Sequence, residues 1–147
     1  MLSLSLFSCS DDDVFSYCEL RIPLGEDFYT IKDENFDAVY SNGEYAVAIL
    51  RISFVAALRE GIPETMSAYE FGEFRLDRCD RPAHLKGNDT VYCEYYDRAS
   101  GREYFYLEAF YRSADAYFVV LFTTDAELDD EGRAAFLNYS KGVYFTN

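Results

Sequence analysis

TVYCEYYD at 90–97, REYFYLEAFYR at 102–112 and YFVVLFTT at 117–124 are three consecutive segments in which β-branched and aromatic residues dominate. Such residues fit the pleated, half-buried surface of a strand. Arg98-Ala-Ser-Gly101 and Ser113-Ala-Asp-Ala116 lie between them and have the composition of turns. The stretch from Thr90 to Thr124 therefore predicts three antiparallel strands joined by short connections.

The third of these segments has almost no polar face before its last two residues. A strand of this kind is covered on both sides, so we expect it inside a sheet with other elements packed on each face. The two-residue period of a strand places Phe118, Val120 and Phe122 on one face. Val119 and Leu121 are expected on the other.

A helix is expected directly afterwards, from about Ala126 to Ser140. Thr124 and Glu127 have the spacing of a capping box, and the acidic residues after Thr124 suit the positive end of the helix dipole. Apolar residues then recur at roughly helical spacing; they are Leu128, Ala135, Phe136, Tyr139 and Val143.

The first half of the chain gives a pattern of shorter elements. Asn42-Gly43 stands between two strand-like runs, at 37–41 and 44–53, and predicts a two-residue hairpin with positive φ at both positions. The other expected elements are a strand within 14–24, a strand at 28–31, a helical turn at 54–61 closed by Gly61, a helix at 63–71 beginning at Pro63, and a strand at 74–76 followed by a loop.

This order of elements contains no alternating βαβ pattern, so it predicts an α+β fold. We expect a twisted antiparallel sheet of about six strands with helices packed on its faces. A chain of 147 residues suits one domain, which we place at 15–147.

Residues 1–8 are apolar or small and carry no charge, and Cys9 follows them. Leu6, Ser8 and Cys9 resemble the end of a bacterial lipoprotein signal peptide, in which the cysteine carries the lipid. Asp11-Asp-Asp13 then resembles the polar tether of such proteins. The segment departs from that pattern because it has no Lys or Arg and only eight residues before the cysteine, whereas a signal peptide has a positive n-region and an apolar run of about 7–15 residues. We therefore interpret 1–14 as a signal-peptide remnant and acidic tether, with the true start upstream.

The alternative for the N-terminus is a first β-strand, because Leu2, Leu4 and Leu6 alternate with serines. In that case Met1 is the true start and the protein is cytosolic. The reading frame upstream of Met1 separates the two interpretations.

The net charge of -14 and the pI near 4.3 exclude two classes of partner. Binding to nucleic acid phosphates and adhesion to anionic lipid both need clustered Lys and Arg. Membrane contact is therefore expected only through lipid on Cys9. One explanation of the negative charge is that it keeps copies of a soluble protein apart by repulsion. The other explanation is a basic protein or ligand partner.

Catalytic and metal sites find little support in the residue pattern. His84 is the only histidine, so a catalytic relay in a hydrolase would have to use it, but its neighbours indicate an exposed loop. Cys79, Asp80 and His84 have metal-binding residue types, yet no second cysteine lies two to four residues from Cys79. We predict no enzyme activity, no metal and no cofactor.

The acidic residues at 125, 127 and 129 have the spacing that begins a calcium-binding EF-hand loop. Such a loop also needs Gly at its sixth place and Glu at its twelfth. Asp130 and Phe136 occupy those places, so helix capping explains the acidic residues better.

Cysteines and tyrosines supply the remaining candidates. Cys79 and Cys93 could form a disulfide outside the cytoplasm, and buried free thiols are the alternative. The tyrosines expected to cluster on one sheet face are Tyr92, Tyr96, Tyr104 and Tyr106. Such a cluster is either half-covered core or an interaction surface, because tyrosine combines an apolar ring with a polar tip.

From about Leu20 to Phe145 the chain resembles the PsbP-like superfamily, which includes the DcrB-type envelope lipoproteins and the effector chaperones of type VI secretion. The segments that carry the resemblance are Ile22-Pro-Leu24 with Phe28, the strand at 46–53, the helix at 64–69, the strand at 116–123 and the closing segment at 136–145. This resemblance implies a binding or assembly module without a shared catalytic motif.

We therefore expect a non-enzymatic, lipid-anchored protein of the bacterial cell envelope that binds an unidentified protein or ligand. The alternative is a cytosolic effector chaperone or adaptor of the same fold. A hydrolase that uses His84 is the third hypothesis.

Overall fold

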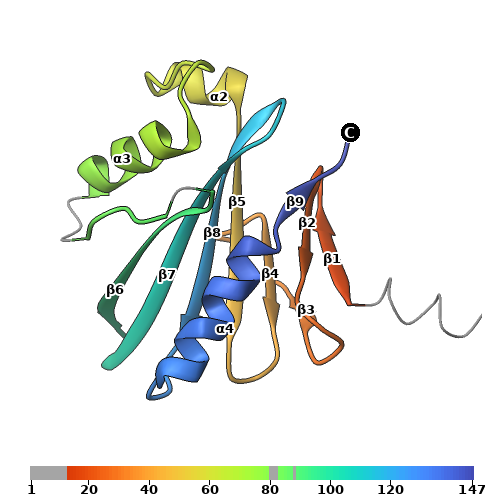
Figure 1. Cartoon of the computed structure of the whole chain (residues 1–147), viewed down its shortest axis with the longest axis vertical. Helices are drawn as coiled ribbons and strands as arrows, with labels where there is room; N and C mark the ends of the chain where they lie inside the picture. Colours follow the sequence, from red (N-terminus) through yellow and green to blue (C-terminus); the bar gives the residue numbers. More distant parts are fainter. Residues whose placement is uncertain (1–12, 80–82, 88) are drawn as a thin grey trace, which may run out of the picture.

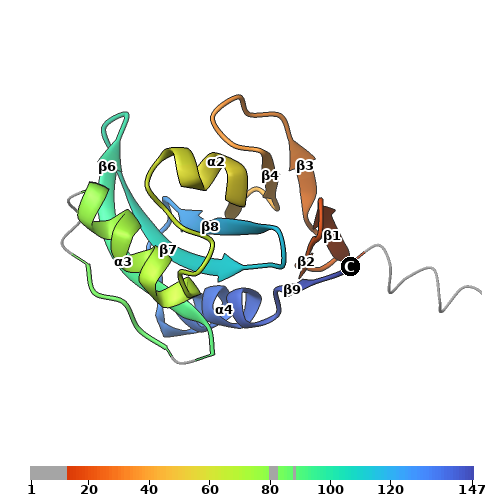
Figure 2. The same cartoon turned by 90° about the horizontal axis from the view of Figure 1, so that it is seen from above.

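The computed structural model describes residues 13–79, 83–87 and 89–147. Cys9, most of its tether and Asp80 lie outside the described residues. Within them the chain forms a six-stranded sheet, a three-stranded sheet and helices on both faces of the larger sheet (Figures 1 and 2). The expected α+β fold with an antiparallel sheet is confirmed. No helix in these ranges is long and apolar enough to span a bilayer.

The larger sheet has the strand order β3-β4-β5-β8-β7-β6, with every neighbouring pair antiparallel. Its strands are β3 (Tyr29–Ile31), β4 (Ala38–Ser41), β5 (Ala46–Ser53), β6 (Val91–Ala99), β7 (Arg102–Arg112) and β8 (Ala116–Thr124). The three strands expected between Thr90 and Thr124 are thus β6, β7 and β8.

β8 is an interior strand, as its unbroken apolar run predicts, since β5 and β7 flank it. Phe118, Val120 and Phe122 are buried in the core on one face of the sheet. Val119 is buried in the core on the other face, and Leu121 packs against that second core. The predicted division of these five side chains is therefore confirmed.

The smaller sheet has the order β1-β2-β9 and consists of β1 (Val14–Tyr17), β2 (Leu20–Pro23) and β9 (Tyr144–Phe145). The sequence predicted one strand within 14–24, but the chain reverses at Cys18, which has a positive φ of 51°. β2 pairs with β9, so residues more than a hundred positions apart lie side by side. Leu20 and Ile22 are fully buried against the larger sheet.

Helix α2 (Phe54–Arg59) follows β5 as predicted, and its Ser53 N-cap side chain accepts a hydrogen bond from the Ala56 amide (3.2 Å). Helix α3 (Ala68–Cys79) corrects the predicted helix at 63–71 and the predicted strand at 74–76. Ser67 and Glu70 form its capping box, each side chain accepting from the other's amide at 3.1 Å. This box starts the helix after Pro63.

Helix α4 (Asp130–Lys141) is the predicted closing helix, but it begins four residues later than expected. Its N-cap is Asp129, whose carboxylate accepts from the Gly132 amide at 2.8 Å. Thr124, the predicted cap, instead accepts from the Ala126 amide within the preceding turn. α4 packs on the face of the larger sheet opposite to α2 and α3 (Figure 2), and Phe136 is fully buried there.

The β4–β5 hairpin exists, but its predicted turn is partly wrong. Ser41 pairs with Ala46, so the loop consists of residues 42–45 rather than of Asn42 and Gly43 alone, and of these two only Gly43 has a positive φ, 93°. The Asn42 side chain instead accepts hydrogen bonds from the amides of Glu44 (2.9 Å) and Tyr45 (2.7 Å). Asn42 therefore holds the turn through its side chain.

Candidate functional site

A groove lies between β1 of the smaller sheet and β3 and β4 of the larger one. It has a volume of about 680 Å³. Figure 2 shows that β3 of the larger sheet lies beside β1 of the smaller one. The residues that line the groove are 14–17, 30–33 and 37–40.

Two aromatic side chains connect the sheets at this groove. The rings of Phe15 and Tyr40 lie 4.7 Å apart, and the Tyr40 hydroxyl donates to the Ser16 carbonyl at 3.3 Å. Burial raises the pKa of Tyr40, and burial followed by the Asp37 carboxylate raises the pKa of Tyr17. Both phenols therefore stay protonated near neutral pH.

Backbone groups of β1 form one wall of the groove. Residue pairs in an antiparallel ladder alternate between hydrogen-bonded and non-hydrogen-bonded. The Leu24 amide donates to the Asp13 carbonyl (3.0 Å), so that pair belongs to the bonded set. Two and four steps further along β1, the bonded residues are Phe15 and Tyr17. The N–H and C=O groups of Val14 and Ser16 consequently point away from β2.

The edge of β3 forms the opposite wall. The Phe54 amide donates to the Asp115 carbonyl (3.1 Å), which continues the ladder between β5 and β8. Even-numbered residues of β5 therefore bond to β8 and odd-numbered ones to β4. Because Tyr40 pairs with Val47 on one side and with Thr30 on the other, the N–H and C=O of Thr30 point away from β4.

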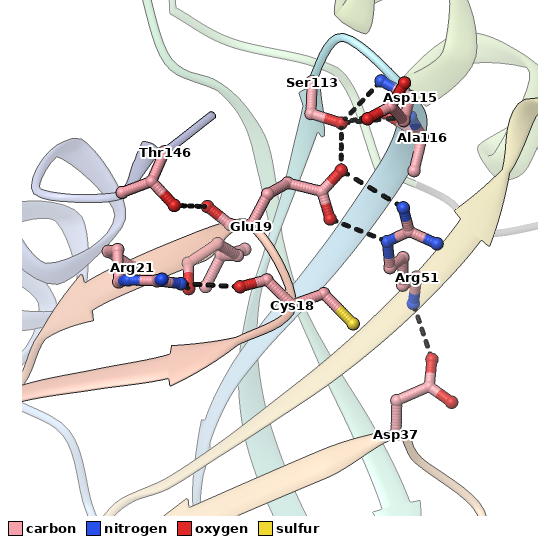
Figure 3. A network of polar contacts seen from close by, with 10 residues as sticks. Cys18, Glu19, Arg21, Asp37, Arg51, Ser113, Asp115, Ala116 and Thr146 are labelled. Carbon is pink, nitrogen blue, oxygen red and sulfur yellow. Dashed lines mark hydrogen bonds and ion pairs between the residues drawn. The ribbon is translucent and has the colours of Figure 1, made fainter.

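A polar network holds one end of the groove in place (Figure 3). Glu19, in the β1–β2 turn, accepts from Arg51 Nε at 2.8 Å and from Arg51 Nη2 at 3.2 Å. The Ser113 hydroxyl donates to the same carboxylate at 2.8 Å. The network therefore links the smaller sheet to β5 and to the β7–β8 turn.

The Arg51 hydrogen bonds lower the pKa of Glu19 to about 2, against the opposing effect of burial. The Glu19 side chain is 14% exposed and that of Arg51 is 24% exposed. An ion pair of this kind is bidentate and partly buried. It therefore has directional hydrogen bonds, and water and salt screen its charges less than those of an exposed pair. We name the contacts among Glu19, Arg51 and Ser113 the clasp.

Asp37 connects the clasp to the groove. Its carboxylate accepts from the Arg51 amide at 2.7 Å, and the residue also lines the groove. Asp33 and Lys32 are the other charged groove residues. The Arg51 guanidinium is engaged by Glu19, so among the described residues that line the groove the two carboxylates outnumber the one lysine.

The predicted tyrosine surface is divided between the two faces of the larger sheet. Tyr92 pairs with Ala109 and Tyr96 with Phe105, which places both tyrosines on the face that α4 covers. Tyr104 and Tyr106 alternate with these partners along β7, so they lie on the opposite face. The prediction of one shared face is wrong, because even-numbered residues of β6 pair with odd-numbered residues of β7.

The tyrosine arrangement that does form includes Tyr95, which was not among the four predicted tyrosines. Tyr95 stacks on Tyr106 with 5.2 Å between ring centroids, and Tyr104 lies 6.3 Å from Tyr106. The Tyr95 hydroxyl donates to the buried Glu108 carboxylate at 2.7 Å. These groups stabilise β6 and β7 together.

No disulfide joins Cys79 to Cys93, so the disulfide alternative is wrong. Cys79 is exposed at the end of α3, while Cys93 is buried within β6. His84 is exposed and shares a small hollow with Glu73 and Asp77. Across 13–79, 83–87 and 89–147, no group of three or more His, Cys, Asp or Glu side chains could hold a metal.

A second hollow of about 660 Å³ lies near Tyr96 and the loop after β8. Its rim carries Arg102, Glu103, Asp125 and Glu127, and Arg102 is already paired with Asp125. Volume therefore does not distinguish the two hollows. The β1–β3 groove differs because it combines two features. The Phe15 and Tyr40 rings form an aromatic floor, and backbone groups face outward on both walls.

The groove is not predictable from the sequence, for a physical reason. Its walls are formed by strands of four and three residues, and its shape depends on how two separate sheets meet. The available signal was the aromatic content of 15–17 and 28–31, bounded by Pro23, Gly25 and acidic residues. That signal predicts strands without indicating that their edges face each other.

Comparison with known proteins adds information on the fold. No family model and no curated protein matches the chain. A crystal structure from Bacteroides thetaiotaomicron VPI-5482, at 1.50 Å resolution, matches with a TM-score of 0.62 and 11% identity. The match covers 92% of this chain and 48% of the other, so this chain spans about half the length of that protein. At this identity the likeness shows a shared fold alone.

Proposed function

We propose that this protein is a non-enzymatic, lipid-anchored module of the bacterial cell envelope that binds a segment of another protein in the β1–β3 groove. The single observation that supports binding is the groove itself, with its aromatic floor and its two strand edges. The proposal also takes up the resemblance of the N-terminus to lipoprotein signal peptides and of the domain to DcrB-type proteins.

The groove lies close in sequence to the proposed lipid. Asp13 immediately precedes β1, and its carbonyl accepts from the amides of Leu24 and Gly25. Four residue steps separate Cys9 from Asp13, a length that can extend at most about 14 Å. A lipid on Cys9 would therefore hold the groove near the membrane surface, where a membrane-associated partner is available.

The anchor is tested by restoring the upstream reading frame, expressing the protein in a bacterium and supplying labelled palmitate. The wild type should incorporate label and sediment with membranes, whereas Cys9→Ala should do neither. Cys18→Ala is the matched control, because Cys18 is an exposed thiol and should not change labelling. A wild type that stays soluble and unlabelled overturns the lipoprotein proposal.

Binding through the groove is tested with a photo-crosslinking residue at position 32, and with the same residue at position 131 on the exposed side of α4. A defined crosslinked partner should form at 32 and not at 131. It should also disappear when Phe15→Ser removes part of the groove floor while circular dichroism shows a retained fold. Crosslinking that is equal at both positions, or unaffected by Phe15→Ser, argues against the groove.

The cytosolic adaptor is the second candidate, because the groove that supports the binding proposal does not depend on a lipid anchor. It uses the same fold and the same groove. Soluble, unlabelled protein that still crosslinks a partner at position 32 supports this candidate.

A further inference from the structure

We propose that the groove binds its partner by strand addition: an extended, basic segment enters between β1 and β3 and joins the two sheets into one. This inference rests on the proposed binding function and specifies its chemistry. The occupant is a segment of another protein in which basic side chains accompany β-branched or other apolar ones.

The sheet edges differ in how much of their backbone is available. At the outer edge of β6, Tyr92 exchanges both backbone hydrogen bonds with Lys86 (2.7 and 3.1 Å). β9 is only two residues long. Among residues 13–79, 83–87 and 89–147, β1 and β3 are the other ends of the two sheets, and both line the same groove. A segment between them would bond on both sides, unlike one added to an isolated edge.

The outward-facing backbone groups set the register of such a segment. Val14 and Ser16 offer two N–H and two C=O groups from β1, and Thr30 offers one of each from β3. The Ser16 carbonyl already accepts from the Tyr40 hydroxyl, but at 3.3 Å that bond is long for an O–H donor. An incoming amide can therefore replace the hydroxyl at this carbonyl.

The side chains of the groove determine the composition of the segment. Successive residues of an added strand point to opposite sides. Residues on one side would contact the Phe15 and Tyr40 rings, which favour β-branched or other apolar side chains. Basic residues would lie near the Asp33 and Asp37 carboxylates, and the net charge of -14 steers a basic segment toward the protein.

Proline substitutions test the backbone part of the proposal with little change to the fold. Proline is tolerated on an edge strand where the lost amide points outward. Ser16→Pro and Thr30→Pro remove one outward amide each from the two walls. Tyr96→Pro is the matched control, because the exchange at Tyr92 shows that even-numbered amides of β6 also point outward, on the far edge of the larger sheet.

The experiment selects binders from a phage-displayed library of random nine-residue peptides, using the folded wild-type protein. Enriched peptides should alternate Lys or Arg with β-branched residues. A synthetic copy of the best peptide should lose about ten-fold or more in affinity to Ser16→Pro and to Thr30→Pro, and keep its affinity for Tyr96→Pro. N-methylation of alternate peptide amides should cause a similar loss. Amide exchange on the wild type should show slower exchange at positions 14, 16 and 30 when the peptide is bound.

Two further variants separate the charge and hydroxyl contributions. Asp33→Asn should weaken the basic peptide several-fold at low salt, whereas Glu131→Gln, which removes a charge on α4, should not. Tyr40→Phe should maintain or increase affinity, because it frees the Ser16 carbonyl. Weaker binding to Tyr40→Phe would show that the hydroxyl itself recognises the ligand and would overturn the strand register.

The outcomes distinguish this inference from the function on which it rests. Peptides that enrich without the basic pattern overturn the basic occupant, and peptides that bind Ser16→Pro and Thr30→Pro as tightly as the wild type overturn strand addition. If position 32 still crosslinks a partner in that case, the binding function stands with another mode of recognition. No enrichment together with no crosslink overturns both.

Discussion

The two sheets of this protein are stabilised in different ways. The centre of the larger sheet is buried on both faces, with Phe122 and Phe136 in one core and Val119 in the other. The smaller sheet buries Leu20 and Ile22 on one side only, and the clasp and a two-residue strand complete its attachment. The larger sheet is therefore held mainly by apolar area, and the smaller one depends more strongly on a few directional contacts.

This difference explains why the groove is found where it is. Apolar burial, which is non-directional, stabilises the centre of the larger sheet. The central strands have a hydrogen-bonded neighbour on each side, so their backbone groups are not available to a ligand. Where the small sheet meets the large one, the contacts are sparse and the two end strands keep outward-facing backbone groups. The two regions should therefore respond differently to substitution.

The largest expected effect belongs to the larger sheet. Phe122→Ala removes a fully buried ring whose centroid lies 6.0 Å from that of the Phe136 ring. The substitution should lower the free energy of unfolding by about 3–5 kcal/mol. Urea denaturation measures the change. The matched control is Tyr96→Ala on an exposed tyrosine of β6, with a loss expected near 1 kcal/mol or less. A Phe122→Ala loss below ~1 kcal/mol would show that β8 is not central.

The larger sheet could be predicted from the sequence to a greater extent than the groove between the two sheets. β6, β7 and β8 were predictable because long strands rich in β-branched and aromatic residues are recognisable locally. Their neighbour α4 was predictable from its spacing, but its start was not, because Thr124 and Asp129 both have cap chemistry. The groove required the pairing of β2 with β9, and no local pattern encodes a contact between segments so distant in sequence.

The clasp gives the second prediction. Glu19→Gln keeps an acceptor for Ser113 but removes the charge that pairs with Arg51, and should cost roughly 1–3 kcal/mol. Urea denaturation at pH 7 measures the loss. Amide exchange should show that β1 and β2 open more readily than β8. Equal opening of both sheets would contradict a separate, clasp-dependent region.

The contribution of Glu19 should also depend on pH. Folding lowers its pKa from an ordinary 4.5 to about 2, so the folded state favours the charged form. The stabilisation is therefore present in full above the ordinary value and is lost as pH falls toward 2. The stability difference between wild type and Glu19→Gln should shrink between pH 4.5 and 2. A difference that is constant over this window would show that the charge contributes nothing.

The two hairpins provide the third prediction. Gly43, in the larger sheet, has a φ of 93°, and no atom beyond its chain neighbours lies within 4 Å of an added Cβ. Gly43→Val should therefore cost about 1–2 kcal/mol through backbone strain alone. Cys18, in the smaller sheet, has a φ of 51° without being glycine, so Cys18→Gly should be neutral or slightly stabilising. Thermal unfolding of both variants measures the contrast, and equal losses would contradict it.

The smallest predicted effect concerns Tyr111, where the two regions meet. This β7 residue is buried, its hydroxyl donates to the Ser140 carbonyl in α4 at 2.6 Å, and its ring lies 6.2 Å from Phe145 of β9. Tyr111→Phe keeps the ring and leaves the carbonyl without this donor, so it should cost about 1 kcal/mol.

Because Tyr111 contacts both regions, its substitution should destabilise them together, unlike Glu19→Gln. Amide exchange should report the same change in opening free energy for β2 and for β8, and Tyr144→Phe, at an exposed phenol of β9, should change neither. A change restricted to β2 would place Tyr111 with the clasp. Burial raises the pKa of Tyr111, so the hydroxyl remains a donor and the loss should be independent of pH between 5 and 8, the reverse of the behaviour expected for Glu19 below pH 4.5.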